Sequence, residues 1–310
     1  MPRVTIMIPT YNQSGYVAQA VASALAQDWP DLEVVVGDDC STDDTPAALA
    51  PFAADPRFRY VRQPRNLGRV GNYRSLLYDH AQGDWALNLD GDDWLCTPDF
   101  VSQAMAVALR DSGIVAVTGR MREQHPDGSL HDRKANADLP DIMDGRDVFL
   151  QLPEERIALY HAATIYRRAD AMAIDFYRRP ILSADWESLH RLILTGKVGF
   201  VSAPAAVWRW HGQNATSLKN ADQVIANLDK ILGPYAFARD NKLVDPATLE
   251  KWFAAMLHRR AVIDAYAFAK RGDMAAYHAY MRRIGELSPS IRRRVAHTPK
   301  ILVKRLLHML

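Results

Sequence analysis

A chain of 310 residues is long enough for one large domain with a smaller appendage, or for two domains. Hydrophobic residues make up 48% and charged residues 24%, which is the composition of a globular protein and excludes a disordered or fibrous one. A net charge of +2 gives no support for a nucleic-acid partner, so we expect none.

The first part of the chain alternates between short apolar runs and helical patterns. Strands are predicted over residues 3–8, 32–36, 58–61, 85–89 and 114–118, and helices over 17–25, from 45 onwards, over 70–81 and after Pro98. The side chains of Ser41 to Asp44 are expected to cap the helix that begins near Thr45. Strands separated by helices in this way predict an α/β domain with a mostly parallel sheet flanked by helices.

The second half is less regular. Residues 121–160 are predicted as polar and irregular, 181–194 as a helix, and 198–201 and 206–210 as extended. After about Lys219 the pattern is helical, with breaks predicted near Gly233-Pro234, Asp245-Pro246, Gly272 and Pro289. We therefore predict a first domain of residues 1–218 and a helical C-terminal region of residues 219–310.

Location in the cell is suggested only indirectly. The N-terminal apolar run ends at Pro9, too early for a signal sequence, and no run reaches the roughly 18 apolar residues of a membrane span. Cys40 and Cys96 have no partner at metal-ligand spacing, so free thiols and a cytoplasmic location are expected. Residues 288–310 carry six Lys or Arg and no Asp or Glu. This segment is either a peripheral contact with the inner face of an anionic membrane or a basic helix that covers the core.

Three polar loops follow predicted strands, namely Thr10-Tyr11-Asn12, Asp38-Asp39 and Asp90-Gly91-Asp92-Asp93. Parallel sheets bind ligands at the carboxyl ends of their strands, so these loops should gather at one edge. Clustered carboxylates repel one another unless a cation or hydrogen-bond donors compensate, and oxygen ligands suit Mg²⁺ or Mn²⁺. The alternative for the acidic loop is a solvated turn, and one of Asp38 and Asp39 is expected to serve backbone donors in its own turn.

Four motifs in sequence order resemble family 2 of the inverting GT-A glycosyltransferases: Pro9-Thr10-Tyr11-Asn12, Val36 to Asp43, Asn66-Leu67-Gly68 and Asp90 to Asp93. The resemblance implies transfer of a sugar from a nucleotide-diphosphate sugar, with a UDP-sugar as the expected donor. The acceptor would be a hydroxyl of a saccharide or a lipid-linked molecule, in the synthesis of a cell-surface polysaccharide. It also divides the predicted catalytic domain into a nucleotide-sugar half, residues 1–118, and an acceptor half, residues 119–218.

The resemblance also implies roles for individual residues in the donor half. The nucleotide-binding set would be Pro9, Thr10, Tyr11, Asp39, Arg69 and Asp90. Arg69 is one of three arginines near the third motif, with Arg65 and Arg74, that could face the diphosphate. A diphosphate-bound Mn²⁺ or Mg²⁺ would be held by Asp92 or by Asp93, because the family places this ligand variably within the run.

In the second half, Ala184-Asp185-Trp186-Glu187 resembles the acidic motif of the family, which makes Asp185 the expected general base. An inverting transfer needs one base to take the proton of the acceptor hydroxyl. In the alternative, Asp185 only caps the N-terminus of the helix and Glu187 is the base. Arg209-Trp210-His211 resembles the Arg-x-His segment, so His211 is expected to bind the metal or a phosphate, or else to pack. His161 is interpreted as a packing residue.

Two other functions remain open. A sugar-nucleotide pyrophosphorylase would need a Gly-rich loop after the first strand, and no glycine precedes Gly15 there. A non-catalytic relative could bind nucleotide or act as a scaffold, although the acidic motif residues Asp39, Asp90, Asp92 and Asp185 are all present.

Overall fold

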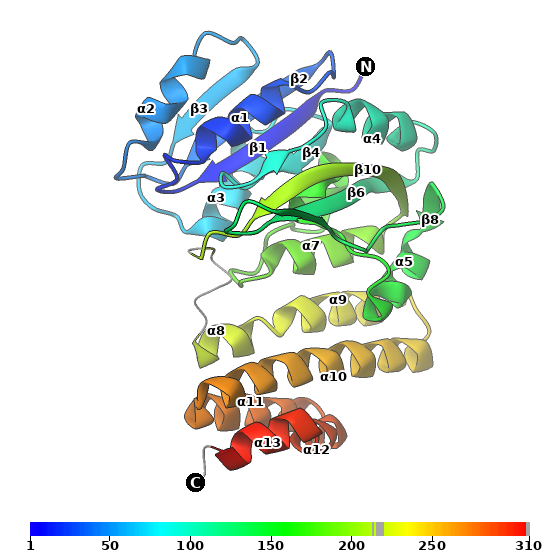
Figure 1. The fold of residues 1–310 in the computed structure, drawn as a ribbon. Helices are drawn as coiled ribbons and strands as arrows, with labels where there is room; N and C mark the ends of the chain where they lie inside the picture. The colour runs from blue at the N-terminus through cyan, green and yellow to red at the C-terminus, as the bar shows by residue number, and fades with distance from the viewer. Residues whose placement is uncertain (213, 215–219, 308–310) are drawn as a thin grey trace. The chain divides into compact units, whose positions relative to one another are not determined.

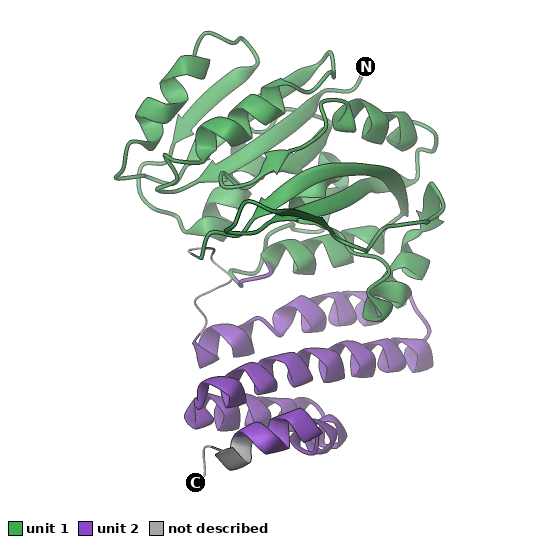
Figure 2. Cartoon of the chain, in the orientation of Figure 1, with its two compact units in different colours: residues 1–180, 184–212 green, residues 181–183, 213–310 purple. Residues whose placement is uncertain are grey.

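The computed structural model describes residues 1–212, 214 and 220–307, and the chain divides into two compact units. Unit 1 comprises residues 1–180 and 184–212, and unit 2 comprises residues 181–183 and 213–310 (Figure 2). The domain boundary predicted at residue 218 lies outside the described residues, as does the stretch 215–219 around it.

Unit 1 is built on one sheet, which ten strands join within the described residues (Figure 1). The strand order is β3-β2-β1-β4-β9-β6-β10-β5, with β7 beside β6 and β8 beside β10. The strands are β1 (Val4–Thr10), β2 (Leu32–Asp38), β3 (Phe58–Arg62), β4 (Trp85–Asn88), β5 (Trp94–Leu95), β6 (Ile114–Gln124), β7 (Leu130–Asp132), β8 (Ile142–Asp144), β9 (Thr164–Arg167) and β10 (Lys197–Arg209). Strands β1 to β4 pair in parallel, and β9 runs antiparallel between β4 and β6.

Helices cover both faces of this sheet, which confirms the predicted α/β class. They are α1 (Val17–Leu25), α2 (Thr45–Leu49), α3 (Arg69–Ser75), α4 (Phe100–Ala108), α5 (Gly145–Gln151), α6 (Arg168–Ala173) and α7 (Ala184–Ile193). Helices α1, α2 and α4 share one core with the central strands, and α3 and α7 lie on the other face (Figure 1). Helix α3 continues into a π-helical turn, so the predicted helix over 70–81 is present but changes its winding at Leu76.

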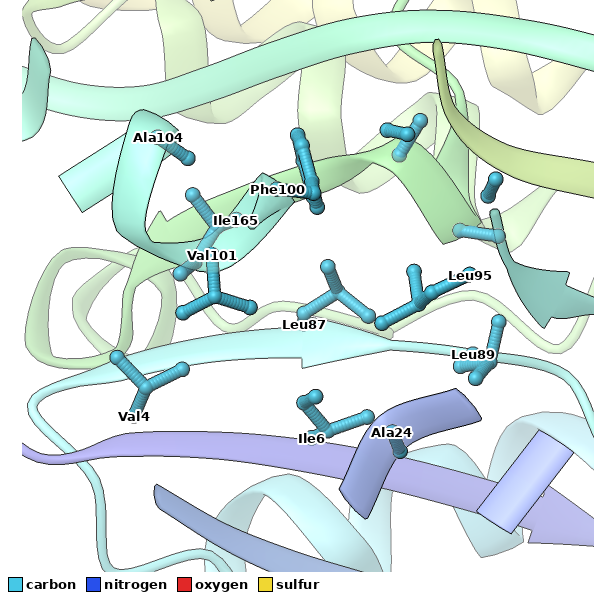
Figure 3. Packing of buried hydrophobic residues seen from close by; sticks show 14 of the residues in the cluster. Val4, Ile6, Ala24, Leu87, Leu89, Leu95, Phe100, Val101, Ala104 and Ile165 are labelled. Atoms are coloured by element: carbon cyan, nitrogen blue, oxygen red, sulfur yellow. The ribbon is translucent and has the colours of Figure 1, made fainter. Parts of the chain in front are cut away.

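The core beside α1 and α4 follows from the two-residue period of the strands. Val4, Ile6 and Ile8 of β1 are fully buried and meet Leu87 of β4 and Phe100 of α4 (Figure 3). Because β1 lies between two strands and is covered on both faces, all of its residues are buried. Such a strand is a continuous apolar run, which the sequence shows clearly.

Three local predictions for unit 1 need correction. Residues 121–160, predicted as irregular, contain the end of β6, the short strands β7 and β8, and α5. Strand β7 is exposed and β8 is at most half-buried, and each has only three residues, so no apolar period reveals them. The two extended segments predicted at 198–201 and 206–210 form one strand, β10, whose register against β6 shifts around Pro204. At α2, the expected capping by Ser41 to Asp44 is confirmed in part: Asp43 accepts from the backbone N–H of Thr45 at 3.0 Å, whereas the N-cap residue Asp44 makes no side-chain capping bond.

Unit 2 is helical throughout its described part, with α8 (Ala221–Ala226), α9 (Asp229–Asp240), α10 (Pro246–Arg271), α11 (Met274–Leu287), α12 (Pro289–Ala296) and α13 (Pro299–Leu307). The breaks predicted at Asp245-Pro246, Gly272 and Pro289 are confirmed. The break predicted near Gly233-Pro234 is wrong, because α9 continues through both residues. Both are buried, so packing outweighs the one helical hydrogen bond that proline lacks.

The basic C-terminal segment contributes its apolar residues to the core of unit 2. Ile291, Val295 and Ile301 are buried there, whereas residues 292–294, three arginines, are exposed. His308 to Leu310 lie outside the described residues. Across the part of the chain that is described, no helix combines the length and the apolar character that crossing a bilayer requires.

Candidate active site

The loops that follow β1, β2 and β4 lie together at one edge of the sheet. β1 pairs in parallel with both other strands, and Thr10 lies opposite Asp38 in the register. The N–H of Asp39 donates to the carbonyl of Thr10 at 2.9 Å, and the N–H of Gly91 donates to the carbonyl of Pro9 at 3.1 Å. The three polar loops therefore meet, as the parallel arrangement predicted.

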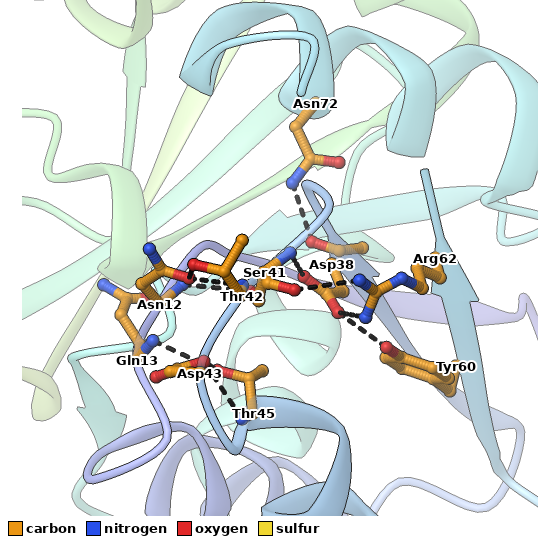
Figure 4. A network of polar contacts seen from close by, with 11 residues as sticks. Asn12, Gln13, Asp38, Ser41, Thr42, Asp43, Thr45, Tyr60, Arg62 and Asn72 are labelled. Carbon is orange, nitrogen blue, oxygen red and sulfur yellow. Dashed lines mark hydrogen bonds and ion pairs between the residues drawn. The ribbon is translucent and has the colours of Figure 1, made fainter. Parts of the chain in front are cut away.

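Hydrogen bonds between side chains and backbone lock the first two loops together (Figure 4). The N–H of Asn12 donates to Ser41 Oγ at 2.9 Å, and Asn12 Oδ1 accepts from the N–H of Thr42 at 2.8 Å. Asn12 and Cys40 have φ values of 52° and 66°, a left-handed conformation that non-glycine residues rarely adopt. The locked loops hold Tyr11 at their tip, where it is 47% exposed and open to an aromatic ligand.

Asp38 and Asp39 are both buried, and both serve protein donors. Asp38 Oδ1 accepts from a backbone N–H of the following turn, and its Oδ2 accepts from the hydroxyl of Tyr60 at 2.6 Å and lies 3.3 Å from Arg62 Nη1 (Figure 4). Asp39 Oδ1 accepts from the N–H of Leu67 at 2.6 Å. Asp39 thereby fixes the Asn66-Leu67-Gly68 motif against the second loop.

The acidic loop after β4 turns its carboxylates in different directions. Asp90 is half-buried, and its Oδ1 accepts from the hydroxyl of Tyr73 at 2.7 Å and from the amide of Asn88 at 3.1 Å. Asp93 is buried, and its Oδ1 accepts from the backbone N–H of Arg209 at 3.0 Å. The last residue of β10 therefore pins the inner end of the acidic loop.

Asp92 faces His211, which lies near the C-terminal end of unit 1 in sequence. Its Oδ2 lies 2.9 Å from Nε2 of His211, and the ring of Tyr16 stacks on that imidazole with centroids 5.0 Å apart. Burial and then the charge of Asp90 raise the pKa of Asp92, and burial raises the pKa of Asp93 well above its ordinary value. Burial and the neighbouring carboxylates therefore disfavour the charged forms of Asp92 and Asp93.

This donor set fits a divalent ion bound together with a diphosphate. The side chains of Asp92 and His211 are 15% and 14% exposed and face each other through Oδ2 and Nε2, whereas Asp93 turns inward. Within the described ranges, no three His, Cys, Asp or Glu side chains form a complete metal site. Mg²⁺ and Mn²⁺ commonly take one or two protein ligands and complete their shell with substrate phosphates and water. An imidazole ligand favours the transition metal of the two.

Gly91 allows the acidic loop to lie against the first loop. A Cβ at this position would lie 2.5 Å from Gln13 Oε1 and 3.0 Å from Thr10 Cβ. The requirement for glycine at this position comes from this close approach. The two loops that carry Thr10 and Asp90 are thus held in direct contact.

Among the three arginines near the third motif, Arg69 faces the site. It begins α3, and its guanidinium lies 5.8 Å from the centroid of the Tyr73 ring. Tyr73, and then the charges of Asp90 and Asp185, raise the pKa of Arg69. Arg69 therefore lies within electrostatic reach of both the acidic loop and the start of α7. Arg74 points elsewhere and pairs with a carboxylate at 2.6 Å outside these loops.

The two acids at the start of α7 differ in their surroundings. Asp185 is the second residue of the helix and not its N-cap, and it is half-buried. Its charge acts on His161, which lies beneath the acidic loop. Glu187 is fully buried and accepts two hydrogen bonds from Arg191, each 2.9 Å, and one of 3.0 Å from Arg178. These buried ion pairs hold Glu187 within the protein, which argues against it as the alternative base.

Three polar residues near the acidic loop were not identified from the sequence as functional candidates, namely Tyr73, Asn88 and Tyr177. His161, interpreted as a packing residue, lies among them, 3.3 Å from Asn88 Nδ2 and 2.6 Å from the hydroxyl of Tyr177. An asparagine inside a buried strand, two residues before Asp90, is the one signal that could have pointed to this group. The tyrosines come from segments with no distinctive pattern.

The chain matches the family model described as glycosyl transferase family 2 over residues 5–173, more than half of its length. It is 34% identical over 157 residues to the succinoglycan biosynthesis protein ExoO of Rhizobium meliloti, covering 48% of this chain and 44% of ExoO. It is 29% identical over 227 residues to a chondroitin synthase of Pasteurella multocida, covering 72% of this chain and 22% of that protein. The chain thus spans less than half the length of either relative.

Two solved structures share its fold. TarS of S. aureus in complex with UDP-GlcNAc has a TM-score of 0.76 at 17% identity, over 99% of this chain and 89% of that one. The mannosyltransferase PcManGT from Pyrobaculum calidifontis, in complex with GDP-Man and Mn²⁺, has a TM-score of 0.58 at 17% identity, over 99% and 84%. This likeness shows the fold, and the family model shows the relationship. The chain belongs to glycosyltransferase family 2 and has the GT-A fold.

Proposed function

We propose that this chain is an inverting, metal-dependent transferase that moves a sugar from a UDP-sugar to a hydroxyl of a saccharide or lipid-linked acceptor. The family supports sugar transfer, and the names of ExoO and of the chondroitin synthase support a role in polysaccharide synthesis. The UDP-GlcNAc complex of TarS supports a UDP-sugar donor. The family assignment gives no support to the pyrophosphorylase alternative.

One arrangement carries the proposal. The exposed Tyr11, the carboxylates of Asp39 and Asp90, and the Asp92–His211 pair belong to loops at one edge of the sheet. In the proposal, the loop from Pro9 to Tyr11 and Asp39 hold the base, and Asp90 holds the ribose. Asp92 and His211 hold the metal ion and, through it, the diphosphate, while Asp93 keeps the loop in shape.

Transfer then needs only one protein base. Asp185 takes the proton of the acceptor hydroxyl while that oxygen attacks the anomeric carbon and the bond to the diphosphate breaks. A bound divalent ion acts as a Lewis acid that stabilises the leaving diphosphate. Arg69, in the field of Asp90 and Asp185, adds a fixed positive charge near the same group. Because one displacement does the work, the anomeric configuration inverts.

Calorimetric titration of UDP with Mn²⁺ or with a chelator tests the donor site. We expect Mn²⁺ to increase UDP affinity by at least tenfold, a coupling of about 1.4 kcal/mol. Asp92→Asn should abolish this increase, whereas Asp170→Asn, a change at a surface ion pair of α6, should preserve it. Equal affinity with and without chelator in the wild type and in Asp92→Asn would refute the metal site.

A non-catalytic, nucleotide-binding relative is the remaining alternative. Thermal shifts against a panel of nucleotide sugars would identify the donor, because a ligand stabilises the folded state by mass action. Incubation of the best donor with saccharide acceptors then separates the two functions. If the donor bound but was neither transferred nor slowly hydrolysed, the result would favour the non-catalytic alternative.

We also propose that residues 292–294 of α12 contact an anionic membrane surface. The three arginines are exposed, whereas the apolar neighbours Ile291 and Val295 are buried in the core of unit 2. Such a contact would therefore be electrostatic adsorption and not insertion of an apolar helix face.

A further inference from the structure

A chain of buried polar side chains begins at the carboxylate of Asp90 and continues beneath the sheet edge. The amide of Asn88 donates to Asp90 Oδ1 at 3.1 Å and lies 3.3 Å from Nδ1 of His161. Nε2 of His161 lies 2.6 Å from the hydroxyl of Tyr177, which lies 3.3 Å from the hydroxyl of Tyr166. Apart from the half-buried Asp90, these residues are all buried.

The chemistry of the groups fixes the direction of the hydrogen bonds from Asp90 to Tyr177. An amide nitrogen can only donate, so Asn88 donates to Nδ1 of His161, and the ring proton is on Nε2. Nε2–H then donates to the hydroxyl of Tyr177, which shares a further hydrogen bond with Tyr166 in which either hydroxyl can donate. Burial lowers the pKa of His161 and so favours the neutral ring that this pattern needs. Asn88 therefore donates to both Asp90 and His161, and these buried hydrogen bonds connect the acidic loop to Tyr177.

Tyr177 also reaches the helix that carries the proposed base. Its backbone N–H donates to Ser188 Oγ at 2.8 Å. Ser188 lies three residues after Asp185, just beyond the first turn of α7, so both belong to one helical segment. Tyr177 thus joins two parts of the site, with its hydroxyl directed to His161 and the acidic loop and its backbone attached to α7.

The backbone at Tyr177 is held in an unfavourable conformation. Its φ of 59° lies in the left-handed region, which is a genuine outlier for a bulky residue. Surrounding donors hold this turn in place, because Arg191 donates to the carbonyl of Asp175 at 3.1 Å and Arg74 donates to the carbonyl of Phe176 at 3.1 Å. Backbone strain of this kind persists where the surrounding structure imposes it, and it clusters at functional sites.

We propose that His161 and Tyr177 are positioning residues that couple Asp90 to the first turn of α7, so that binding of the donor sets the position of the base. This inference rests on the proposed function, in which Asp90 contacts the donor and Asp185 is the base. It predicts an order of events, since the acceptor hydroxyl is activated only after the donor has bound.

Two matched variants test the coupling. Tyr177→Phe removes the hydroxyl that contacts His161 and keeps the ring. Tyr166→Phe removes an equally buried hydroxyl at the far end of the same network, outside the path from Asp90 to α7. Tyr177→Phe loses two buried hydrogen bonds and Tyr166→Phe loses one, so Tyr177→Phe should have the lower melting temperature, and both variants are assayed well below either transition. A difference between the two variants in amide exchange or in kcat then reports the connection from Asp90 through His161 and Tyr177 to α7, and not a general loss of stability.

Hydrogen exchange with UDP and Mn²⁺ gives a readout that needs no turnover. In the wild type and in Tyr166→Phe, UDP should slow amide exchange in the first turn of α7 about threefold or more. In Tyr177→Phe this protection should vanish, while UDP affinity stays within about twofold of the wild type. Unchanged protection in Tyr177→Phe, or equal loss in both variants, would overturn the proposal.

Kinetics then connect the coupling to the base. Tyr177→Phe should lower kcat about tenfold with little change in the donor KM, since misplacement of a reacting group costs rate rather than binding. In an Asp185→Asn background the same change should have no further effect. A tenfold loss that persists there would overturn action through the base. Full activity of Asp185→Asn alone would instead refute the proposed base and leave the exchange experiment to decide the coupling.

Discussion

Acidic residues that are close in sequence have different surroundings in this site, and their surroundings divide their roles. Asp92 stays accessible beside His211, whereas Asp93 turns inward to the backbone of β10. Asp185 stays half-buried at the start of α7, whereas Glu187 is enclosed by two arginines. In each pair, the acid that we propose for chemistry is partly exposed, and the other is bonded to the protein around it.

Substitution of the proposed base should separate transfer from donor binding. Asp185→Asn should lower the rate of transfer by roughly 10²–10⁴-fold, the usual range for loss of general-base catalysis. The affinity for UDP should be unchanged, because the base acts on the acceptor. Proton NMR of the first product should show an inverted anomeric centre in the wild type. Full activity of the variant would return Asp185 to a structural role, and a retained configuration would remove the family as a guide to mechanism.

His161 should make stability depend on pH. Burial lowers the pKa of His161 below the ordinary 6.5, and the charge of Arg69 also lowers it. The charges of Asp185 and Asp90 raise the pKa but do not outweigh burial. The unfolded chain therefore binds a proton near pH 6.5 that the folded chain does not, so stability falls as the pH drops below that value. Urea unfolding should show that the free energy of unfolding falls less from pH 7.5 to pH 5.5 in His161→Gln than in the wild type. His131→Gln, a change at an exposed position, should show the same fall in the free energy of unfolding as the wild type. An equal fall in all three proteins would contradict the attribution of this pH dependence to His161.

The sequence was sufficient to locate the acids but not to orient them. Asp39, Asp90 and Asp92 follow apolar runs, and strand ends in a parallel sheet meet at one edge. The orientation of Asp93 depends on Arg209, which is 116 residues away in sequence. No local pattern carries information about a partner at that distance, and the same holds for the contact between His161 and Tyr177.

At the scale of elements, buried strands were predictable and exposed ones were not. Strands β1, β2 and β4 are covered on both faces, so their apolar runs stand out in the sequence. Strands β7 and β8 are short and not buried, and only their pairing with β6 and β10 makes them strands. Strand β10 is long and irregular in register, yet it positions both Arg209 and, just beyond its end, His211.

Helix α7 should depend strongly on its buried ion pair. Glu187→Gln removes one charge and leaves Arg191 buried without its carboxylate, which typically costs 3–5 kcal/mol, taken here as about 4. Asp170→Asn, at an ion pair of α6 that is about one-third exposed, should cost less than about 1 kcal/mol. Urea unfolding followed by tryptophan fluorescence measures both. Similar costs for the two variants would show that Glu187 is not the anchor of α7.

The exposed face of α12 should control adsorption to membranes. Each basic residue near an anionic surface contributes about 1 kcal/mol, so changing residues 292–294 to Gln should weaken vesicle binding about 100-fold. The binding of the wild type should also fall with added salt. A control with Lys251, Lys270 and Arg282 changed to Gln loses the same charge from exposed positions of α10 and α11. Equal cosedimentation of both triple variants with phosphatidylserine vesicles would mean that net charge, and not α12, governs binding.

For the whole molecule, the proposed chemistry belongs to unit 1 although the family match covers only part of it. The matched residues 5–173 include the donor loops, while Asp185, Arg209 and His211 follow them in sequence and still belong to unit 1. Unit 2 has its own buried core around Leu257, Phe268 and other residues. Donor binding and the stability of unit 2 should therefore be separable in experiment.

Differential scanning calorimetry can test this separation. With UDP and Mn²⁺ at 100 times the dissociation constant, unit 1 should gain about 2.7 kcal/mol. For a unit of about 200 residues, this gain corresponds to a rise in melting temperature of roughly 5–10 °C. The transition of unit 2 should move by less than about 1 °C, because none of the proposed donor residues lies in it. Glu187→Gln assigns the transitions, since it should lower only that of unit 1. If UDP raised both transitions equally, or only the one that Glu187→Gln leaves unchanged, the placement of the donor site wholly within unit 1 would be wrong.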